Sequence, residues 1–256
     1  MAFEDIKKKQ LVFTVATGRC GTAFLAEILR LVPGAASYHE PKPEYAEILR
    51  GAQEAPERAR DFLVEKKLPA ISQDDSSIYI ETSHLFCKGF LEPLLDLGIV
   101  PAIIWMRRGH REVASSMFRG GTIPGRTEKG LCFYLSPEDP GVLLCENWKS
   151  LNDYQLCYWY CLEIERRALQ YRSLFKENGW YWGETSISGI TKVEGFRQLL
   201  LDLNLPKMSW YSWLRYLNNR RRKVNPTSIL KQKVALPNHL DDLENEVENL
   251  IREPRD

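Results

Sequence analysis

The stretch LVFTVATGRCGTAFLAEILRLV, residues 11–32, decides the fold. It begins as an apolar, β-prone run and ends with apolar residues that recur at helical spacing. Between them lies the turn TGRCGT, residues 17–22, whose two glycines let backbone N–H groups face inward at a helix N-terminus. Arg19 adds a positive charge to this turn and Thr22 adds a hydroxyl. The stretch therefore predicts a strand, an anion-binding loop and a helix.

This turn differs from the P-loop of nucleotide kinases and NTPases. That loop reads GxxxxGK[ST], with the lysine on the phosphates and the following hydroxyl on magnesium. The present turn is shorter and has no lysine. A Gly-rich strand-to-helix turn without a ligand is the alternative, and the turn alone does not separate the two interpretations.

Composition sets the class of protein. The 256 residues are 44% hydrophobic and 27% charged with a net charge of +1, which allows one sizeable core and gives no bulk charge for nucleic acid. The first ten residues are charged and no apolar run is long enough to span a bilayer, so we expect a cytoplasmic protein without a membrane segment. The six cysteines show no CxxC pair and no zinc spacing with the four histidines. We expect reduced packing thiols and no metal site.

Polar residues follow two further predicted strands. The strand AASYH, residues 35–39, stops at HEPKP because its prolines cannot continue a regular element, and SIYIET, residues 77–82, is followed by Ser-His. In an open α/β sheet, ligands bind at the carboxyl ends of the strands. Glu40 and His84 are therefore candidate proton acceptors. An ordinary loop carboxylate and a structural histidine are the alternatives.

The run IVPAIIWM, residues 99–106, is almost continuously apolar, as expected for a central strand buried on both faces of a parallel sheet. It leads into RRGHRE and the helical segment VASSMF. Ser116 lies eight residues after Arg108, so a helix places it within about two turns of its N-terminus, facing the groove that Arg108 enters. A solvated basic surface or an ion-pair network is the alternative.

Together, TGRCGTAFL and WMRRGHREVASSMFRGGTIPG resemble the two nucleotide-binding signatures of sulfotransferases that use 3'-phosphoadenosine 5'-phosphosulfate (PAPS). The first resembles the 5'-phosphosulfate loop of that family, and it implies that the donor is bound by Thr17, Gly18, Arg19, Cys20, Gly21, Thr22 and Ala23. Ala23 departs from the pattern, because many members have a second threonine there. The second resembles the 3'-phosphate motif, in which Arg108 and Ser116 hold the 3'-phosphate. HEPKP and ETSHLF are similar to the segments where bacterial small-molecule members carry the general base.

Two later segments complete the expected site. Residues 120–148 are rich in Gly and Pro without a clear period, which is typical of a long loop over a site, and we take them as the candidate acceptor lid. Residues 216–233 gather basic side chains that suit a nucleic-acid patch, a solvated tail or a phosphate clamp. The resemblance implies that this segment lies against the 3'-phosphate, through one or more of Arg220, Arg221 and Arg222.

We expect a single α/β domain over residues 1–256, with a mainly parallel central sheet flanked by helices, because strands and helices alternate. Beyond the strands above, the pattern predicts a strand at 180–184 and helices at 44–51, 55–68, 88–97, 149–176, 193–203 and 239–251. The resemblance implies a P-loop NTPase-like sulfotransferase fold.

The resemblance also implies a reaction, namely transfer of a sulfuryl group from PAPS to a hydroxyl or amine of a small molecule, with PAP as product and no metal. Arg19 would stabilise the leaving oxygens, and Glu40 or His84 would take the acceptor proton. His84 resembles the histidine of the phenol and steroid branch, and an unperturbed histidine pKa near 6.5 suits this task. We favour Glu40, because the arginine-bearing loop looks more like branches with a glutamate base.

Two other classes of function stay open. A P-loop kinase or NTPase would need a loop lysine and an acidic metal ligand after an apolar strand, whereas the central strand ends in arginines. A non-catalytic nucleotide-binding protein would keep the basic loops and need neither Glu40 nor His84.

Overall fold

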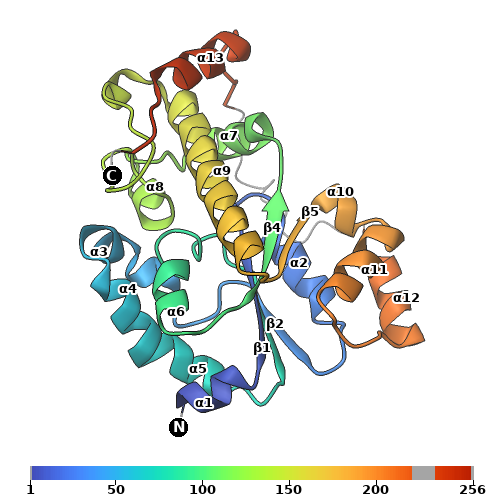
Figure 1. The fold of residues 1–256 in the computed structure, drawn as a ribbon. Helices are drawn as coiled ribbons and strands as arrows, with labels where there is room; N and C mark the ends of the chain where they lie inside the picture. Colours follow the sequence, from blue (N-terminus) through green and yellow to red (C-terminus); the bar gives the residue numbers. More distant parts are fainter. Residues whose placement is uncertain (1, 221–233, 255–256) are drawn as a thin grey trace.

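The computed structural model describes residues 2–220 and 234–254 (Figure 1). Five strands form one sheet in the order β2-β3-β1-β4-β5, with every neighbouring pair parallel. The strands are β1 (Gln10–Val15), β2 (Ala35–Tyr38), β3 (Ile78–Glu81), β4 (Ala102–Arg107) and β5 (Trp182–Ser186). The predicted α/β class with a parallel sheet is confirmed.

The central strand is β1, which pairs with β3 on one side and β4 on the other. Its residues Leu11 to Val15 and all of β3 are buried, which explains why these strands are apolar rather than alternating. Because all five strands point the same way, the segments that follow them meet at one edge of the sheet. The loops that carry the predicted site residues therefore lie together.

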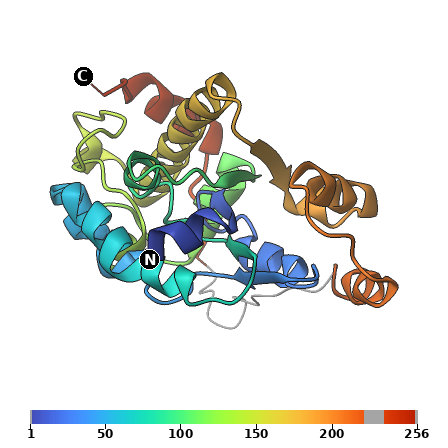
Figure 2. The same ribbon diagram turned by 60° about the horizontal axis from the view of Figure 1, so that its bottom comes forward.

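Helices flank the sheet (Figures 1 and 2). The α-helices are α1 (Ala2–Lys7), α2 (Thr22–Leu29), α3 (Leu49–Glu54), α4 (Glu57–Phe62), α5 (Leu68–Ser72), α6 (Leu91–Asp96), α7 (His110–Arg119), α8 (Glu128–Phe133), α9 (Asp153–Glu177), α10 (Ile187–Ile190), α11 (Val193–Asp202), α12 (Trp210–Asn219) and α13 (Leu240–Leu250). The short elements are the 3-10 turns η1 (Tyr45–Glu47) and η3 (Trp148–Ser150) and the π-helix η2 (Leu63–Lys67). In both views α10, α11 and α12 form a group beyond β5.

Helix α9 begins four residues later than the pattern predicts. Asn152 and Gln155 form a capping box, in which each side chain accepts a hydrogen bond from the backbone N–H of the other. This fixes the first helical residue at Asp153, and the residues before it form η3. Its aromatic residues Trp159 and Tyr160 are buried in the core.

The predicted helix at 55–68 is α4, η2 and α5 in continuous succession. Pro69 has no N–H to donate to the preceding turn, and the chain widens there into a π-helix. Similarly, β4 starts only at Ala102, because Pro101 cannot donate to a sheet ladder.

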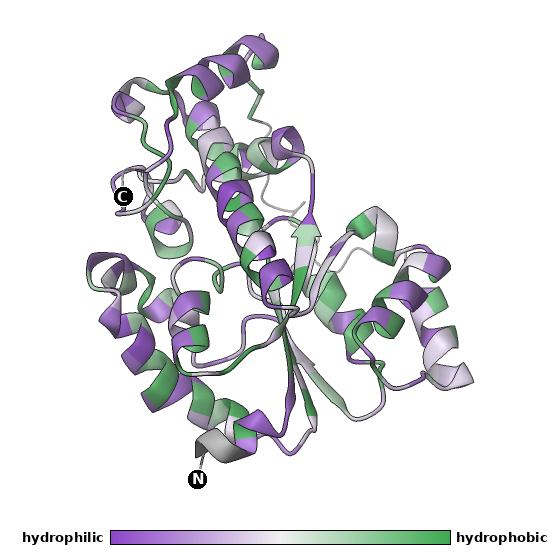
Figure 3. Cartoon of the chain, viewed as in Figure 1, coloured by the Kyte–Doolittle hydropathy of each residue, from purple (hydrophilic) through white to green (hydrophobic). Residues whose placement is uncertain are grey.

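Helix α12 was not predicted, and segment 120–148 includes the short helix α8 rather than being irregular throughout. The acidic helix α13, largely purple in Figure 3, packs on α9 through polar contacts. The hydroxyl of Tyr158 on α9 donates to Glu248 at 2.7 Å. Among the described residues, no helix has the length and apolarity needed to cross a bilayer.

Candidate functional site

The loop between β1 and α2 adopts backbone angles that its glycines make possible. Gly18 (φ 84°), Arg19 (φ 57°) and Gly21 (φ 94°) all lie in the left-handed region. A Cβ on Gly21 would lie 2.1 Å from Cδ1 of Ile187 at the start of α10. The positive φ is the requirement for glycine at position 21, since the Ile187 side chain is partly exposed and could move.

This loop presents a row of donors. Within the described parts of the chain, the backbone N–H groups of Gly18, Cys20, Gly21 and Thr22 have no acceptor, although Cys20 and Thr22 are buried. Buried N–H groups need a partner, and N–H groups at a helix N-terminus suit an anion. The predicted donor-binding residues 17–23 thus form a loop whose N–H groups could meet an anion. Ala23 extends this loop into α2.

The side chains of Thr17 and Cys20 support the loop from inside. The Thr17 hydroxyl donates to the carbonyl of Gly18 at 2.9 Å and lies 2.8 Å from the Cys20 sulfur. Tyr160 of α9 donates to the Thr17 carbonyl at 2.8 Å. Sequence reasoning missed Tyr160, because its reach to the loop depends on how α9 crosses the sheet.

The two sequence motifs meet at this loop. Nε of Arg19 donates to the Ser116 hydroxyl at 3.1 Å, and Nη1 of Arg108 donates to the carbonyl of Arg19 at 2.8 Å. Arg108 also pairs with Glu112 at 3.1 Å. Ser116 on α7 and Arg108 after β4 therefore face the groove that the loop borders, as their spacing predicts.

A pocket of about 380 Å³ opens at the carboxyl ends of β1, β4 and β5. Thr17, Arg108 and Ser186 line it, together with an ion-paired group. In that group Glu165 of α9 lies 3.2 Å from His110 and 3.4 Å from Arg107. Apolar side chains such as Trp105 and Ile164 share the lining with these charged groups. The pocket adjoins the loop through Thr17, so it offers room for a nucleotide beside the unpaired N–H groups.

Glu40 and His84 come together at the opposite side of the loop. The His84 ring lies over Gly18, where a Cβ would be 3.2 Å from its Cγ. Nε2 of His84 is 3.4 Å from Oε1 of Glu40. That oxygen is buried without a hydrogen-bond partner in the described structure, and Glu40 has a left-handed backbone (φ 48°). Strain and an unsatisfied carboxylate at one residue are features of functional sites.

Lys88 is a further charged residue of this cluster that sequence reasoning missed. It is fully buried, and its Nζ lies 2.9 Å from Nδ1 of His84. Burial lowers the pKa of Lys88 to about 7. Burial also lowers the pKa of His84 well below its usual range, and the charges of Lys88, His39 and Arg19 add to this. The only signal in the sequence was a lysine within the apolar run LFCKGF.

The segment that carries Glu40 is anchored by a second buried lysine. Lys67 of η2 donates to the carbonyls of Pro41 and Pro43 at 3.2 and 3.0 Å. It also pairs with the fully buried Glu81 at 2.8 Å. Lys67 thus ties this loop to the end of β3.

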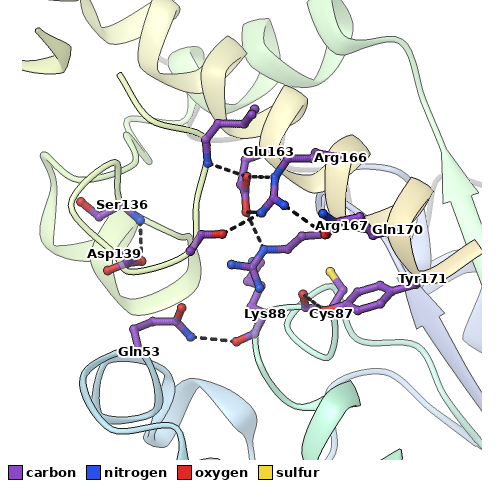
Figure 4. Close-up of polar contacts among 12 residues, drawn as sticks. Gln53, Cys87, Lys88, Ser136, Asp139, Glu163, Arg166, Arg167, Gln170 and Tyr171 are labelled. Carbon is purple, nitrogen blue, oxygen red and sulfur yellow. Dashed lines mark hydrogen bonds and ion pairs between the residues drawn. The ribbon is translucent and has the colours of Figure 1, made fainter. Parts of the chain in front are cut away.

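The candidate lid approaches the same cluster. The ring of Tyr134 lies 5.6 Å from that of His84. Arg50 of α3 holds this stretch by donating to the carbonyl of Tyr134 and to the carboxylate of Asp139. On α9, Glu163 accepts a hydrogen bond from the N–H of Leu143 at 2.9 Å (Figure 4). Segment 120–148 is therefore fastened to α3 and to α9.

Of the three arginines predicted to contact the 3'-phosphate, only Arg220 lies within the described residues. Arg220 donates to the carbonyl of Thr191 after α10, at 3.3 Å. Arg221 and Arg222 lie outside the described residues. No group of three or more His, Cys, Asp and Glu side chains within the described residues is arranged to hold a metal ion.

Neither a protein-family model nor a curated protein matches the sequence. Among solved structures, the sulfotransferase domain from the Synechococcus PCC 7002 olefin synthase is similar, with a TM-score of 0.53 and 12% identity over 94% of this chain and 94% of that chain. The mouse sulfotransferase SULT7A1 complexed with PAP has a TM-score of 0.49 and 12% identity, over 96% of this chain and 86% of that chain. The first of these likenesses shows that the chain has the α/β fold of a sulfotransferase domain.

Proposed function

We propose that the protein is a sulfotransferase that transfers a sulfuryl group from PAPS to a hydroxyl or amine of a small-molecule acceptor. The observation that carries the proposal is the contact between the two motifs, in which Arg19 bonds to Ser116 and Arg108 bonds to Arg19. Residues almost a hundred positions apart thereby surround one groove. The fold of the chain supports the same function.

The residues present fit the proposed donor. The unpartnered N–H groups of the first loop suit its 5'-phosphate. Arg108 and Ser116 suit its 3'-phosphate, because a guanidinium and a hydroxyl both donate to phosphate oxygens. Arg220, Arg221 and Arg222 stay candidates for a further contact to that group.

PAPS supplies an activated sulfuryl group, and the protein positions the acceptor in line with it. A bond forms between the acceptor oxygen or nitrogen and sulfur, while the bond from sulfur to the bridging oxygen breaks and its electron pair leaves with PAP. Arg19 stabilises the negative charge on the leaving oxygens. Glu40 or His84 takes the acceptor proton.

The test is incubation of the protein with PAPS labelled with 35S and a panel of sugars, phenols, amines and lipid head groups. Transfer of label to an acceptor supports the proposal. Hydrolysis of a labelled nucleoside triphosphate with magnesium would instead indicate an NTPase. Tight binding of PAP without transfer to any acceptor would indicate a nucleotide-binding protein.

A further inference from the structure

The amine of Lys88 is surrounded by groups that can accept its hydrogens. Nζ lies 2.5 Å from the carbonyl oxygen of Phe133 and 2.9 Å from Nδ1 of His84. The ring centroids of Tyr134 and Tyr160 lie 5.0 and 5.1 Å from it. A carbonyl oxygen, an imidazole lone pair and two ring faces all attract positive charge. An ammonium group therefore finds an acceptor in each direction.

The position of Lys88 determines the protonation state of His84. An ammonium group can only donate, so while Lys88 is protonated Nδ1 is the bare nitrogen and the neutral ring holds its proton on Nε2. Nε2 is the nitrogen that faces Oε1 of Glu40 at 3.4 Å. A second proton on His84 would point directly at the Lys88 ammonium. The Nε2–H of His84 thus lies on the Glu40 side of the ring, 3.4 Å from an oxygen that makes no hydrogen bond in the described structure.

We infer that Lys88 is a positioning residue that fixes His84 as the neutral Nε2–H tautomer, and that Glu40 is consequently the only one of the two candidates able to accept a proton. The part of this inference that concerns the reaction rests on the proposed sulfotransferase function. His84 then stabilises the Glu40 carboxylate and orients its second oxygen for the acceptor. Lys88 thus decides which of Glu40 and His84 acts as the general base.

Lys88 is held firmly enough for this task. Gln53 of α3 donates to the Lys88 carbonyl at 2.8 Å, and Tyr171 of α9 lies 3.4 Å from the Cys87 carbonyl (Figure 4). Both contacts fix the backbone that carries the Lys88 side chain, and the carbonyl of Phe133 holds its amine.

Other charged groups act on the two residues separately. His39 and Arg19 disfavour a second proton on His84. Around Lys88, Glu40 and Cys87 favour the ammonium, while Arg50 and Arg167 oppose it. Glu40 is the acidic partner, and it lies on the Nε2 side of the ring.

The direct test is NMR of protein labelled with 15N at its four histidines, with His84 assigned from the His84→Gln variant. At pH 6 we expect His84 to remain neutral, with its proton on Nε2 and a bare Nδ1. In Lys88→Met we expect this tautomer preference to disappear, so that the proton is shared between Nδ1 and Nε2, while burial keeps the ring neutral at that pH. A charged His84, or a proton on Nδ1 in the unmodified protein, would overturn the inference. This measurement needs no turnover, so it stands apart from the test of the proposed function.

Kinetics give a second test once an acceptor is known. The amide nitrogen of glutamine lies near the position of Nε2, so His84→Gln keeps a donor to Glu40, whereas His84→Asn does not. We expect His84→Gln to stay within about tenfold of the original single-turnover rate, while Glu40→Gln and His84→Asn lose about a hundredfold. Lys88→Met should fall between them, and Lys176→Met, an exposed lysine on α9, should be unchanged. Equal loss in both His84 variants with a nearly active Glu40→Gln would make His84 the base.

Discussion

Arg108 is held by two protein groups and still reaches the groove. It donates to the carbonyl of Arg19 and pairs with Glu112, and its side chain is 40% exposed. Its remaining N–H donors are available for a charge-assisted contact, which is stronger than a neutral hydrogen bond. A ligand that lacks the matching phosphate would leave this contact unmade.

We predict that Arg108→Ala weakens binding of PAP by about 1.5 to 3 kcal/mol and hardly changes binding of the analogue without the 3'-phosphate. Isothermal titration calorimetry with both nucleotides measures the difference. Arg119→Ala, which removes an exposed arginine at the end of α7, is the matched control. Equal losses for the two nucleotides would contradict the assignment of Arg108 to the 3'-phosphate.

Lys88 also predicts how stability depends on pH. Its folded pKa of about 7 lies below the ordinary lysine value of 10.5. Below pH 7 both the folded and the unfolded chain hold the proton, and the cost of burying the charge is fully present. Between pH 7 and 10.5 the unfolded chain holds more protons than the folded one, so this residue makes the free energy of unfolding rise with pH.

Lys88→Met should remove that dependence. We compare the change in the free energy of unfolding caused by Lys88→Met at the two pH values. This change should be more favourable at pH 6 than at pH 9, by up to about 3 kcal/mol. Urea denaturation at both pH values measures it, with Lys176→Met as the control that should show no such difference. Identical pH profiles for Lys88→Met and the unmodified protein would show that Lys88 keeps an ordinary pKa.

At the scale of elements, the π-helix η2 is what brings Lys67 to the Glu40 loop. Pro69 widens the turn, and Lys67 reaches the carbonyls of Pro41 and Pro43 and the carboxylate of Glu81. Removal of one partner of a buried ion pair typically costs about 3 to 5 kcal/mol. The same change also releases the segment that positions Glu40.

We therefore predict that Lys67→Met lowers the free energy of unfolding by about 3 to 5 kcal/mol and slows sulfuryl transfer while PAP still binds. Lys66→Met, which changes the exposed neighbouring lysine, should alter neither quantity. In Lys67→Met with Glu81→Leu, the unpaired charge is gone, so stability should largely return while the rate stays low. Recovery of the rate in that double variant would show that Lys67 has no positioning role.

The sequence could predict features whose cause lies close by in the chain. The loop around Arg19 and the eight-residue spacing of Arg108 and Ser116 are local patterns, and the parallel sheet follows from the alternation of elements. Burial of Lys88 could not be predicted, because it depends on Tyr134 and Tyr160 closing over it from distant elements. Helix α12 is amphipathic, and it was missed because its last residues fall in the segment 216–233 that was assigned by its basic charge alone.

At the scale of the whole molecule, positive charge gathers at the carboxyl edge of the sheet. Arg19 follows β1, while Arg107 and Arg108 lie at the end of β4. In the proposed reaction, these residues and the N–H groups of the first loop would supply the electrostatic stabilisation that transfer of an anionic group requires. Their charge would take the role that magnesium has in kinases.

We predict that treatment with EDTA leaves the rate of sulfuryl transfer unchanged. The measurement compares chelated and untreated protein with the labelled donor, and protein supplied with magnesium serves as the control. Loss of activity on chelation that magnesium alone restores would favour an NTPase-like reaction.

The sheet order also governs the course of folding. The central strand, residues 10–15, pairs with strands that begin only at residues 78 and 102, and every such parallel pairing closes a long loop. Closing such a loop costs chain entropy before the strands gain any stabilising contact, so folding is slow. During synthesis the apolar strand β1 therefore stays unpaired until both β3 and β4 have left the ribosome. A chaperone that covers residues 11–16 in that interval should raise the yield of folded protein more than one that acts on the finished chain.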